Sequence, residues 1–430
     1  MIRKRKILYV VAMVAVAGLA CLTLFFVHTC NEESEEYPLF PLPPIPRLTN
    51  EMFNLPAFDM VNKTVSDFLK QWKINGASLA IAKDGRLLYV KGFGYADVEQ
   101  KTEVTPTHIF RVASVSKLVT ATAIMQLVEQ GKLSLDDKVF GSEGILSDFV
   151  SCEIRDERTL QITVQRLLEH SAGWDASKGD DPMFMGHAIA KERRVPLPVG
   201  ISDIICFVLS KRLSFEVGDH SEYSNFGYAV LGCIIEKVTG RAYEDYVRET
   251  LLTPMNITNM RLGNSYPHDR YANEVSYYDM LGAKPVAAFD NPHRYVPKCR
   301  GGYDIRTLGA AGGWVASPLA LLRFVLCVDG KPEVPDILSS ESVKKMVSSD
   351  SIFDPLGWRM TDDYRWIRTG TLIGTSVAAV SDADGWCWVF IANTTSKKGA
   401  DFPFEVEDMM RDLLRTMEDD QRIVGSGRCE

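Results

Sequence analysis

The amino-acid sequence predicts an α/β fold of the α+β type, in which strands from both ends of the chain form one antiparallel sheet. Near the amino terminus, two β-rich runs flank the dipeptide Asp84–Gly85, which is a strong hairpin signal. Near the carboxyl terminus, residues 364–395 contain β-rich runs separated by a DADG turn. Because helical patterns fill the chain between them, we expect helices to flank the sheet and a mostly helical subdomain to be inserted between its halves.

The composition is that of a globular protein with one large domain, which we place at residues 51–418. Hydrophobic residues make up 46% of the chain and charged residues 24%. The net charge of −8 argues against nucleic-acid binding, which needs a basic face, so we expect no nucleic-acid partner. The scattered cysteines form no CxxC pair and no HExxH motif is present, so we expect neither a metal site nor a cofactor.

The first 50 residues indicate a membrane anchor and a spacer. Basic residues 1–6 precede an uncharged run at 7–27, which as a helix is about 32 Å long and spans a bilayer. Since basic residues tend to stay in the cytoplasm, we expect the amino terminus inside and the domain extracellular or lumenal. Residues 28–50 form a proline-rich linker and 419–430 a tail. A cleaved signal peptide is the alternative interpretation of the apolar run.

Sequons and cysteines bear on this placement. Three N-x-[ST] sequons make Asn62, Asn256 and Asn393 glycosylation candidates. Cysteines outside the anchor pair in an oxidising compartment, but buried free thiols are an equal expectation for four that lie among apolar residues. These four are Cys206, Cys233, Cys327 and Cys387.

The remaining segments predict the other elements in order. Helices are expected at 58–72, 114–130, 224–240, 317–328 and 404–417. Gly131 is a suitable stop for the second of these. Residues 160–174 indicate a short strand or turn that enters a helix. Residues 263–312 have little periodicity, and we expect either a long excursion beside a substrate mouth or a surface insertion.

Ser114 lies three residues before Lys117, at the head of the second predicted helix. This spacing puts the hydroxyl and the ammonium group on one helical face. A serine nucleophile needs a proton acceptor, and a desolvated lysine with a lowered pKa can share in proton transfer. A helix start with a solvated lysine is the alternative interpretation. Ser116 is a weaker candidate, because its partner at the same spacing is Val119.

Two further motifs carry groups that could complete such a site. EYSNFG places Tyr223 and Asn225 before the helix at 224–240, where a tyrosine beside a cation can act as a base. An Asn/Ser helix cap with a packed tyrosine is the structural alternative. IRTGTLIG places Arg368, Thr369 and Gly370 on a strand edge that glycine leaves open to close backbone approach, and the alternative is an exposed strand.

The three motifs in this order resemble the serine β-lactamases and penicillin-binding proteins, with S-x-x-K, then S/Y-x-N, then K-T-G. The resemblance covers residues 55–415 and is nearest to the branch of class C β-lactamases and D-alanyl-D-alanine carboxypeptidases. It implies that Ser114 is the acylated nucleophile, Lys117 its activating partner and Tyr223 the general base. Asn225 corresponds to the amide that orients the substrate.

The same resemblance assigns the strand. Arg368, Thr369 and Gly370 take the K-T-G or H-x-G position, and the backbone N–H groups of Ser114 and Thr371 form the oxyanion hole. Arg368 departs from the family pattern: arginine keeps the positive charge but cannot release a proton. His170 is a family feature that we interpret as structural.

These observations predict a membrane-anchored serine hydrolase that cleaves an amide or ester through an acyl-enzyme on Ser114. Its partners are a small-molecule or peptide substrate, and the membrane through the amino-terminal helix. The alternative is a catalytically silent relative that binds a partner or polymerises. An α/β-hydrolase is excluded, because the chain contains no G-x-S-x-G motif.

Overall fold

A computed structural model gives the fold and describes residues 48–148, 152–178, 181–348 and 352–419. These residues belong to one compact unit of the chain. The predicted anchor at 7–27, nearly all of the linker and the tail from 420 lie outside the described residues and stay predictions. Within the described ranges, no helix is both long enough and apolar enough to cross a bilayer.

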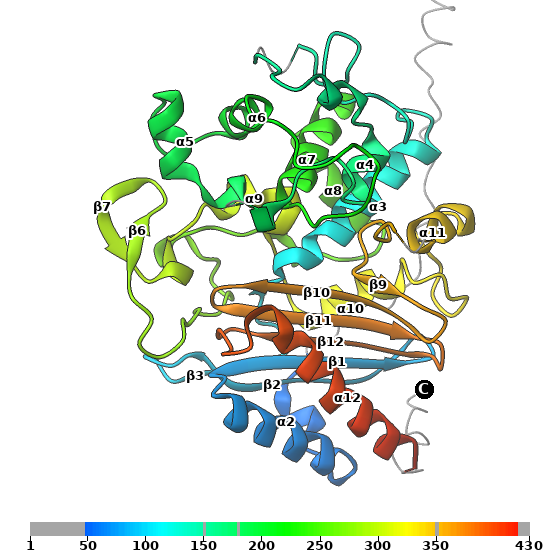
Figure 1. Ribbon diagram of the computed structural model, residues 1–430. Coiled ribbons are helices and arrows are strands. Elements are labelled where there is room, and N and C mark those ends of the chain that lie inside the picture. Colours follow the sequence, from blue (N-terminus) through cyan, green and yellow to red (C-terminus); the bar gives the residue numbers. More distant parts are fainter. Residues whose placement is uncertain (1–47, 149–151, 179–180, 349–351, 420–430) are drawn as a thin grey trace, which may run out of the picture. The chain divides into compact units, whose positions relative to one another are not determined.

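The central sheet has seven strands in the order β3-β2-β1-β12-β11-β10-β9, and all neighbours are antiparallel (Figure 1). Strands from the two ends of the chain pair at its centre, where Ala80 lies opposite Val389. This arrangement confirms the predicted fold class. The strands are β1 (Gly76–Lys83), β2 (Arg86–Asp97), β3 (Thr102–Glu103), β9 (Met360–Thr361), β10 (Arg365–Leu372), β11 (Thr375–Asp382) and β12 (Trp386–Ala392).

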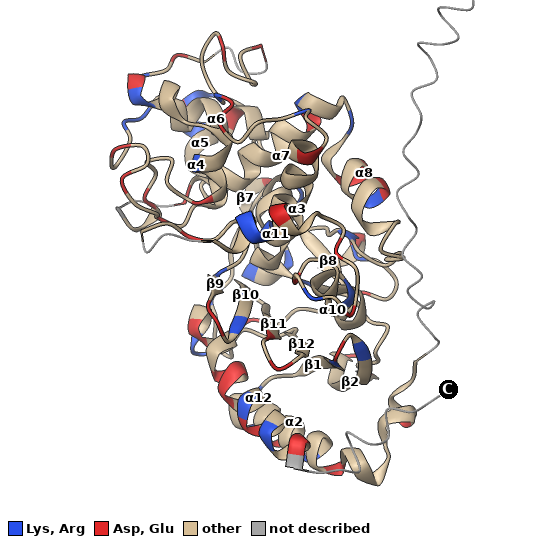
Figure 2. Cartoon of the chain, turned by 90° about the vertical axis from the view of Figure 1, so that its right-hand side faces the viewer, with Lys and Arg blue, Asp and Glu red and all other residues tan. Residues whose placement is uncertain are grey.

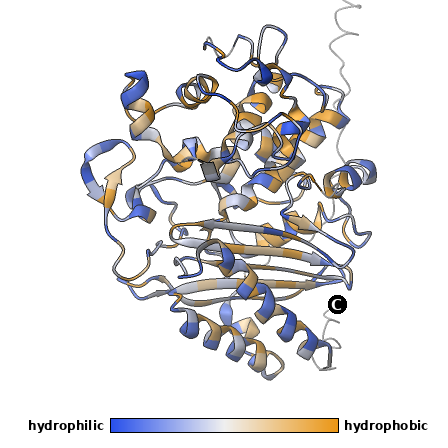
Figure 3. Cartoon of the chain, in the orientation of Figure 1, coloured by the Kyte–Doolittle hydropathy of each residue, from blue (hydrophilic) through white to orange (hydrophobic). Residues whose placement is uncertain are grey.

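Helices cover both faces of the sheet. On one face lie α2 (Asp59–Trp72) and α12 (Phe402–Asp419), which are amphipathic and meet where the rings of Phe68 and Phe402 stack at 5.7 Å (Figures 1 and 3). On the other face α10 (Pro318–Leu326) packs against β1, β11 and β12. The remaining helices lie beyond α10, on the same side of the sheet (Figures 1 and 2).

The helical part lies between the two halves of the sheet in sequence and is built around α3, whose first twelve residues are buried on every side. Its helices are α3 (Ser116–Glu129), α4 (Val164–Leu168), α5 (Gly186–Arg193), α6 (Ile201–Leu209), α7 (Asn225–Thr239), α8 (Tyr243–Val247), α9 (Ile305–Gly312) and α11 (Ser340–Val347). Two small sheets accompany them, formed by β4 (Phe110–Arg111), β8 (Trp314–Ala316) and β5 (Arg261–Leu262), and by β6 (Val286–Ala288) and β7 (Asn291–Val296).

Short 3-10 turns connect the elements at Asn50–Phe53, Pro56–Phe58, Ala113–Val115, Glu157–Gln161, Ala176–Lys178, Pro182–Phe184, Pro267–Asp269, Lys298–Arg300 and Gly399–Asp401, and a π turn lies at Arg248–Leu252. The second predicted helix therefore begins two residues late. Ser114 lies in the turn Ala113–Val115 (η3), and α3 starts at Ser116. Ala113, directly before Ser114, has a left-handed φ of 47°, so the helix cannot extend back through it.

The long excursion at 263–312 contains the β6–β7 hairpin and α9, and a buried arginine ties it to the core. Arg111 is 2% exposed and donates to the carbonyls of Cys299 and Asn264, both at 2.8 Å. Its guanidinium also stacks on Tyr277, 4.1 Å from the ring centre. The low periodicity of this segment thus reflects anchoring by buried polar contacts rather than an amphipathic face.

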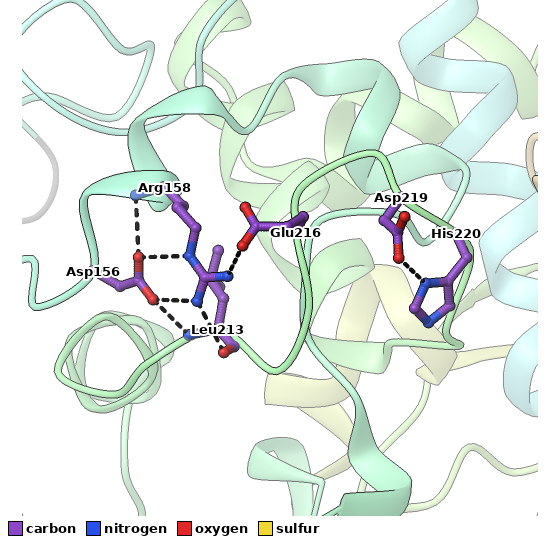
Figure 4. A network of polar contacts seen from close by, with 6 residues as sticks. All are labelled: Asp156, Arg158, Leu213, Glu216, Asp219 and His220. Carbon is purple, nitrogen blue, oxygen red and sulfur yellow. Dashed lines mark hydrogen bonds and ion pairs between the residues drawn. The ribbon is translucent and has the colours of Figure 1, made fainter.

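The segment that leads to Tyr223 is held by a polar network and a disulfide. The Asp156 carboxylate accepts hydrogen bonds from the Arg158 guanidinium and from the backbone N–H of Leu213, while Arg158 also pairs with Glu216 (Figure 4). The hydrogen bonds from Arg158 keep the pKa of Asp156 below its usual range. Cys152 and Cys206 form a disulfide in the same region.

The structure shows how the cysteines and the sequon asparagines are placed. Cys206 is not a free thiol, because it pairs with Cys152, whereas the described free cysteines are all buried: Cys233, Cys299, Cys327 and Cys387. Asn393 is wrong as a glycosylation site, since it is fully buried and its amide donates to the Tyr95 carbonyl at 3.0 Å. Asn62 is also disfavoured, because its amide bonds Phe53, Tyr89 and Lys91. Asn256 is exposed.

Candidate active site

Three parts of the fold meet at a cavity of about 550 Å³. The turn η3 brings Ser114, the loop before α7 brings Tyr223, and β10 forms one wall. Of the predicted site residues, all but the buried Lys117 and Gly370 line the cavity. The lining residues include Ser114, Phe184, Tyr223, Asn225, Lys298, Tyr303, Leu308, Gly312, Arg359, Arg368, Thr369, Thr371, Leu372, Ile373, Thr395, Asp401 and Phe404.

The hydroxyls of Tyr223 and Ser114 are in direct contact. The Tyr223 hydroxyl lies 2.6 Å from Ser114 Oγ, although 109 positions separate the two residues in sequence. The Lys117 ammonium lies 4.8 Å from the centre of the Tyr223 ring. The structure therefore brings together the three groups that the sequence proposed for nucleophilic chemistry.

Lys117 is buried, and its ammonium group donates hydrogen bonds to two neutral groups. Its side chain is 0% exposed, and Nζ donates to Asn225 Oδ1 and to the Ala311 carbonyl, both at 2.6 Å. Both acceptors are neutral, so burial dominates and lowers the pKa of Lys117 to about 8. The solvated-lysine alternative is thereby excluded, and this ammonium group can exchange its proton near neutral pH.

A kink in α9 supplies one of these acceptors. Gly309 adopts φ 24° and ψ −103° inside the helix, which interrupts its regular hydrogen bonding. The carbonyls beyond it then point at α3, where Ala310 accepts from Thr120 and Ala311 from Lys117. The unusual backbone conformation in the sequence GAAGG is thus at Gly309.

Two opposing effects set the acidity of Tyr223. Burial of the phenol opposes its ionisation, but the positive charges of Lys117 and Arg368 outweigh burial and lower the pKa of Tyr223. The hydrogen bond with Ser114 acts in the same direction. A phenol with a lowered pKa beside a serine hydroxyl has the properties of a general base.

Asp181 is a site residue that the sequence analysis missed. It accepts from Asn225 Nδ2 at 2.6 Å, which turns the amide so that Oδ1 faces Lys117. Asp181 also caps the turn Pro182–Phe184 by accepting from the Met183 N–H. The capping role of Asp181 can be predicted from the sequence. No sequence pattern predicts its contact with Asn225, which lies 44 residues later.

Strand β10 lies against the backbone of the serine turn, and Gly370 permits this approach. A Cβ atom at position 370 would lie 2.4 Å from the Val112 carbonyl and 3.0 Å from the Ser114 nitrogen. Thr369 and Thr371 flank this glycine and line the cavity. The strand is therefore not the freely exposed edge of the alternative interpretation.

Arg368 hydrogen-bonds the backbone at Ser114. It is 2% exposed, and its Nε donates to the Ser114 carbonyl at 2.8 Å while Nη1 donates to the Trp358 carbonyl at 3.2 Å. Two guanidinium nitrogens, Nε and Nη1, thus donate to backbone carbonyls. The guanidinium therefore cannot use these two nitrogens to bind a carboxylate. Its position is that of a fixed positive charge beside Ser114 and Tyr223.

His170 and Ser116 have structural contacts. His170 Nδ1 accepts from the backbone N–H of Ser224 at 3.1 Å, and its ring lies 4.8 Å from that of Tyr223. Burial lowers the pKa of His170 well below its usual value, so the ring is neutral. Ser116 Oγ donates to the Ala113 carbonyl and accepts from the Trp314 N–H. The Ser116 hydroxyl is therefore held by two backbone groups, whereas the Ser114 hydroxyl lines the cavity.

The described residues contain no group of three or more His, Cys, Asp or Glu side chains that could hold a metal ion. The cavity instead offers a hydroxyl, a phenol, an amide and an ammonium group around one open space. This set of groups, in a helical domain joined to an antiparallel sheet, defines a class of proteins built for acyl transfer to serine. The chain belongs to the beta-lactamase family, whose model matches residues 61–403.

Comparisons with individual known proteins agree with this family assignment. Protein flp of Staphylococcus aureus (strain N315) is 28% identical over 259 residues, which cover 58% of this chain and 47% of flp. The chain thus spans about half the length of this curated relative. The octameric penicillin-binding protein homologue from Pyrococcus abyssi is 25% identical with a TM-score of 0.59, covering 79% of this chain and 74% of the homologue.

The likeness to D-amino acid amidase from Ochrobactrum anthropi SV3 shows only that the two proteins have the same fold. It is 20% identical with a TM-score of 0.65, and the match covers 85% of this chain and 99% of the amidase.

Proposed function

We propose that this protein is a serine hydrolase that cleaves an amide or ester through an acyl-enzyme on Ser114. The observation that carries this proposal is the 2.6 Å contact between the hydroxyls of Ser114 and Tyr223. Membership of the beta-lactamase family and the lowered pKa values of Lys117 and Tyr223 support it.

In the proposed reaction Tyr223 takes the proton from Ser114 Oγ as that oxygen attacks the substrate carbonyl. The carbonyl oxygen becomes an oxyanion, which the backbone N–H groups of Ser114 and Thr371 stabilise. When the carbonyl re-forms, the leaving amine or alcohol receives the proton from Tyr223. Water then attacks the acyl-enzyme by the same route, releasing the acid and free Ser114.

Lys117 and Asn225 support both halves of the reaction. The ammonium group of Lys117 stabilises the ionised phenol and exchanges protons with it. The Asn225 amide, fixed by Asp181, holds Lys117 and orients the substrate carbonyl. The beta-lactamase family and the amidase likeness leave the acyl group and leaving group open, so a small molecule and a peptide are both substrates of the proposed class.

The proposal includes a membrane anchor at 7–27, with the domain outside the cytoplasm. Its support is the uncharged run itself and, independently, the Cys152–Cys206 disulfide, since disulfides persist in oxidising compartments. Extraction of cell membranes at alkaline pH tests the anchor: the full chain should remain in the pellet, and a chain lacking residues 1–47 should not.

A fluorophosphonate probe tests the hydrolase directly. The wild-type protein should gain the mass of one adduct, on the peptide that contains Ser114, and Ser114→Ala should gain none. Ser116→Ala is the matched control, because it removes the neighbouring hydroxyl and should still be labelled. Absence of labelling in folded wild-type protein would instead favour the catalytically silent relative.

A further inference from the structure

A second cavity, larger than the first, lies next to the candidate active site. It has a volume of about 680 Å³ and lies between the end of α2 and the segments 277–281, 297–300 and 394–397. We call it the distal groove. Its lining residues are Gln71, Trp72, Lys73, Asn75, Tyr277, Tyr278, Asp279, Met280, Leu281, Pro297, Cys299, Arg300, Thr394, Thr395 and Lys397.

The walls of the distal groove carry cations stacked on aromatic rings. Lys397 Nζ lies 5.3 Å from the centre of the Trp72 ring, and the Arg300 guanidinium lies 5.0 Å from that of Tyr278. Lys73 adds a third cation. The one carboxylate among the lining residues, Asp279, accepts from the backbone N–H of Lys298. The groove is therefore net positive on a chain whose net charge is −8.

The three cations differ in whether a described carboxylate lies close enough to pair with them. Arg300 lies 3.4 Å from Glu99, and nearby Lys398 lies 2.7 Å from Glu405. In the part of the chain that the structure describes, no such ion pair involves Lys73 or Lys397. Unpaired positive charges beside aromatic faces in a concave site attract an anion whose attached chain packs on the rings.

The distal groove shares a wall with the candidate active site. Thr395 lines both cavities, and in the segment 297–299 Lys298 faces the active site while Pro297 and Cys299 face the groove. Thr395 Oγ1 accepts from the Gly374 N–H at 2.6 Å, and its N–H donates to the Tyr278 carbonyl at 2.9 Å. The two cavities are thus neighbours across a wall fixed by backbone hydrogen bonds.

We propose that the distal groove is a substrate subsite, which binds an anionic group several bonds from the scissile amide or ester. The inference rests on the proposed function and gives it a substrate class: elongated acyl compounds with a carboxylate, sulfate or phosphate at the far end. Lys73, Arg300 and Lys397 bind that anion, and Trp72 and Tyr278 pack against the chain that carries it. Lys298 adds a cation on the active-site side of the shared wall.

The test compares paired ester probes. One series comprises 4-nitrophenyl monoesters of straight dicarboxylic acids with four to twelve carbons, and its partner series has the free carboxylate capped as a methyl ester. The ratio of kcat/KM for the anionic and the neutral member should rise with chain length to at least about fivefold in wild type. The double variant Lys73→Glu and Lys397→Glu should lower that ratio to one or less.

The matched control is Lys344→Glu with Lys345→Glu, an equal charge reversal on the exposed side of α11, which should leave the ratio as in wild type. Salt at 0.5 M should weaken the preference of wild type for the anionic probe, because it screens exposed charges. A ratio that does not depend on chain length, or that the groove variant does not change, would overturn the proposal.

Failure of the subsite and failure of the proposed function give different results. If wild type hydrolyses no probe, including 4-nitrophenyl acetate, the proposed function fails. The groove is then tested by calorimetry with dodecanedioate itself. Binding to wild type that weakens at least fivefold in the Lys73→Glu, Lys397→Glu variant supports an anion site, and equal binding to both proteins contradicts it.

Discussion

Lys117 shows how single residues set the chemistry of this site. Its ammonium group has exchanged water for two neutral acceptors, Asn225 and Ala311, and this burial lowers its pKa to about 8. Arg368 contributes a second positive charge beside Ser114 and Tyr223. Together the two cations favour the ionised form of Tyr223, at the cost of holding like charges near each other.

This arrangement predicts a specific pH dependence for Arg368 variants. The rate of fluorophosphonate labelling should rise as the Lys117–Tyr223 pair loses its first proton, with a midpoint near pH 8 set by Lys117. Arg368→Gln removes a positive charge, so proton loss becomes harder and the midpoint should move to higher pH. Arg368→Lys keeps the charge and should leave the midpoint within about half a unit. Equal shifts in the two variants would contradict the electrostatic role of Arg368.

A substitution at Gly370 tests the contact between β10 and the serine turn. The added Cβ of Gly370→Ala would overlap the Val112 carbonyl, so the strand or the turn must move. We expect a loss of about 1–3 kcal/mol in unfolding free energy and at least a tenfold slower labelling rate. Gly186→Ala is the control, since its Cβ would meet only Val199 at 3.6 Å. Labelling of Gly370→Ala at the wild-type rate would show that this contact does not matter.

Much of the site follows from the sequence, and its limits are physical. The S-x-x-K spacing places Ser114 and Lys117 one turn apart, which local geometry alone predicts. The meeting of Tyr223 with Ser114 joins residues 109 positions apart, and only the family resemblance predicted it. The orientation of the Arg368 guanidinium depends on the carbonyls of Ser114 and Trp358. No local sequence pattern predicts where those carbonyls lie.

At the scale of elements, the helices and strands follow their sequence signals where those signals are local. The α7 helix begins at the Ser224 cap, whose side chain accepts from the Gly227 N–H, and ends at the left-handed Gly240. Such signals were absent at 263–312, where buried contacts of Arg111 replace amphipathic packing. The segment between α10 and α11 is likewise held by polar groups, here the buried Asp329 and the half-buried Asp336.

Those carboxylates predict that stability depends on pH. Burial raises the pKa of Asp336 to about 7 and that of Asp329 to about 6. An acid with a raised pKa binds its proton more tightly in the folded state. Its contribution to stability is therefore complete below its unfolded pKa near 4 and is lost as pH rises through 7.

Asp336→Asn isolates this effect. The amide oxygen can still accept from the Gly330 N–H, but no charge forms at high pH. At pH 8 the variant should be more stable than wild type by on the order of 1–2 kcal/mol, and between pH 5 and 8 its unfolding free energy should vary less. Urea titrations at several pH values measure this, and parallel curves for the two proteins would refute the assignment.

At the scale of the whole molecule, the strand order pairs β1 with β12 at the centre of the sheet, and the helical part meets the sheet at η3 and β10. The groups of the candidate site come from both parts, so the site exists only when the sheet and the helical part fold together. The fold class was predictable because hairpin and helix periods are local. The cavity was not, since its walls come from segments far apart in the chain.

Glycosylation reports the predicted placement of the domain outside the cytoplasm. When the full chain is made in the secretory pathway, Asn256 should carry a glycan, because it is exposed, and Asn393 should not, because it is buried. Treatment with peptide N-glycosidase should lower the mass of wild type and of Asn393→Gln, but it should not change the mass of Asn256→Gln. The absence of a glycan at Asn256 would contradict this placement, and a glycan on Asn393 would contradict its burial.

The most direct test of the central claim is the rate at which a fluorophosphonate modifies Ser114 when the Tyr223 hydroxyl is removed. We predict that Tyr223→Phe reacts at least about a hundredfold more slowly than wild type. Tyr228→Phe is the matched control: it loses a nearby phenol that donates to the Leu168 carbonyl and not to Ser114, and it should stay within about fivefold of wild type. Equal rates for Tyr223→Phe and wild type, with the circular dichroism unchanged, would show that Tyr223 does not activate Ser114.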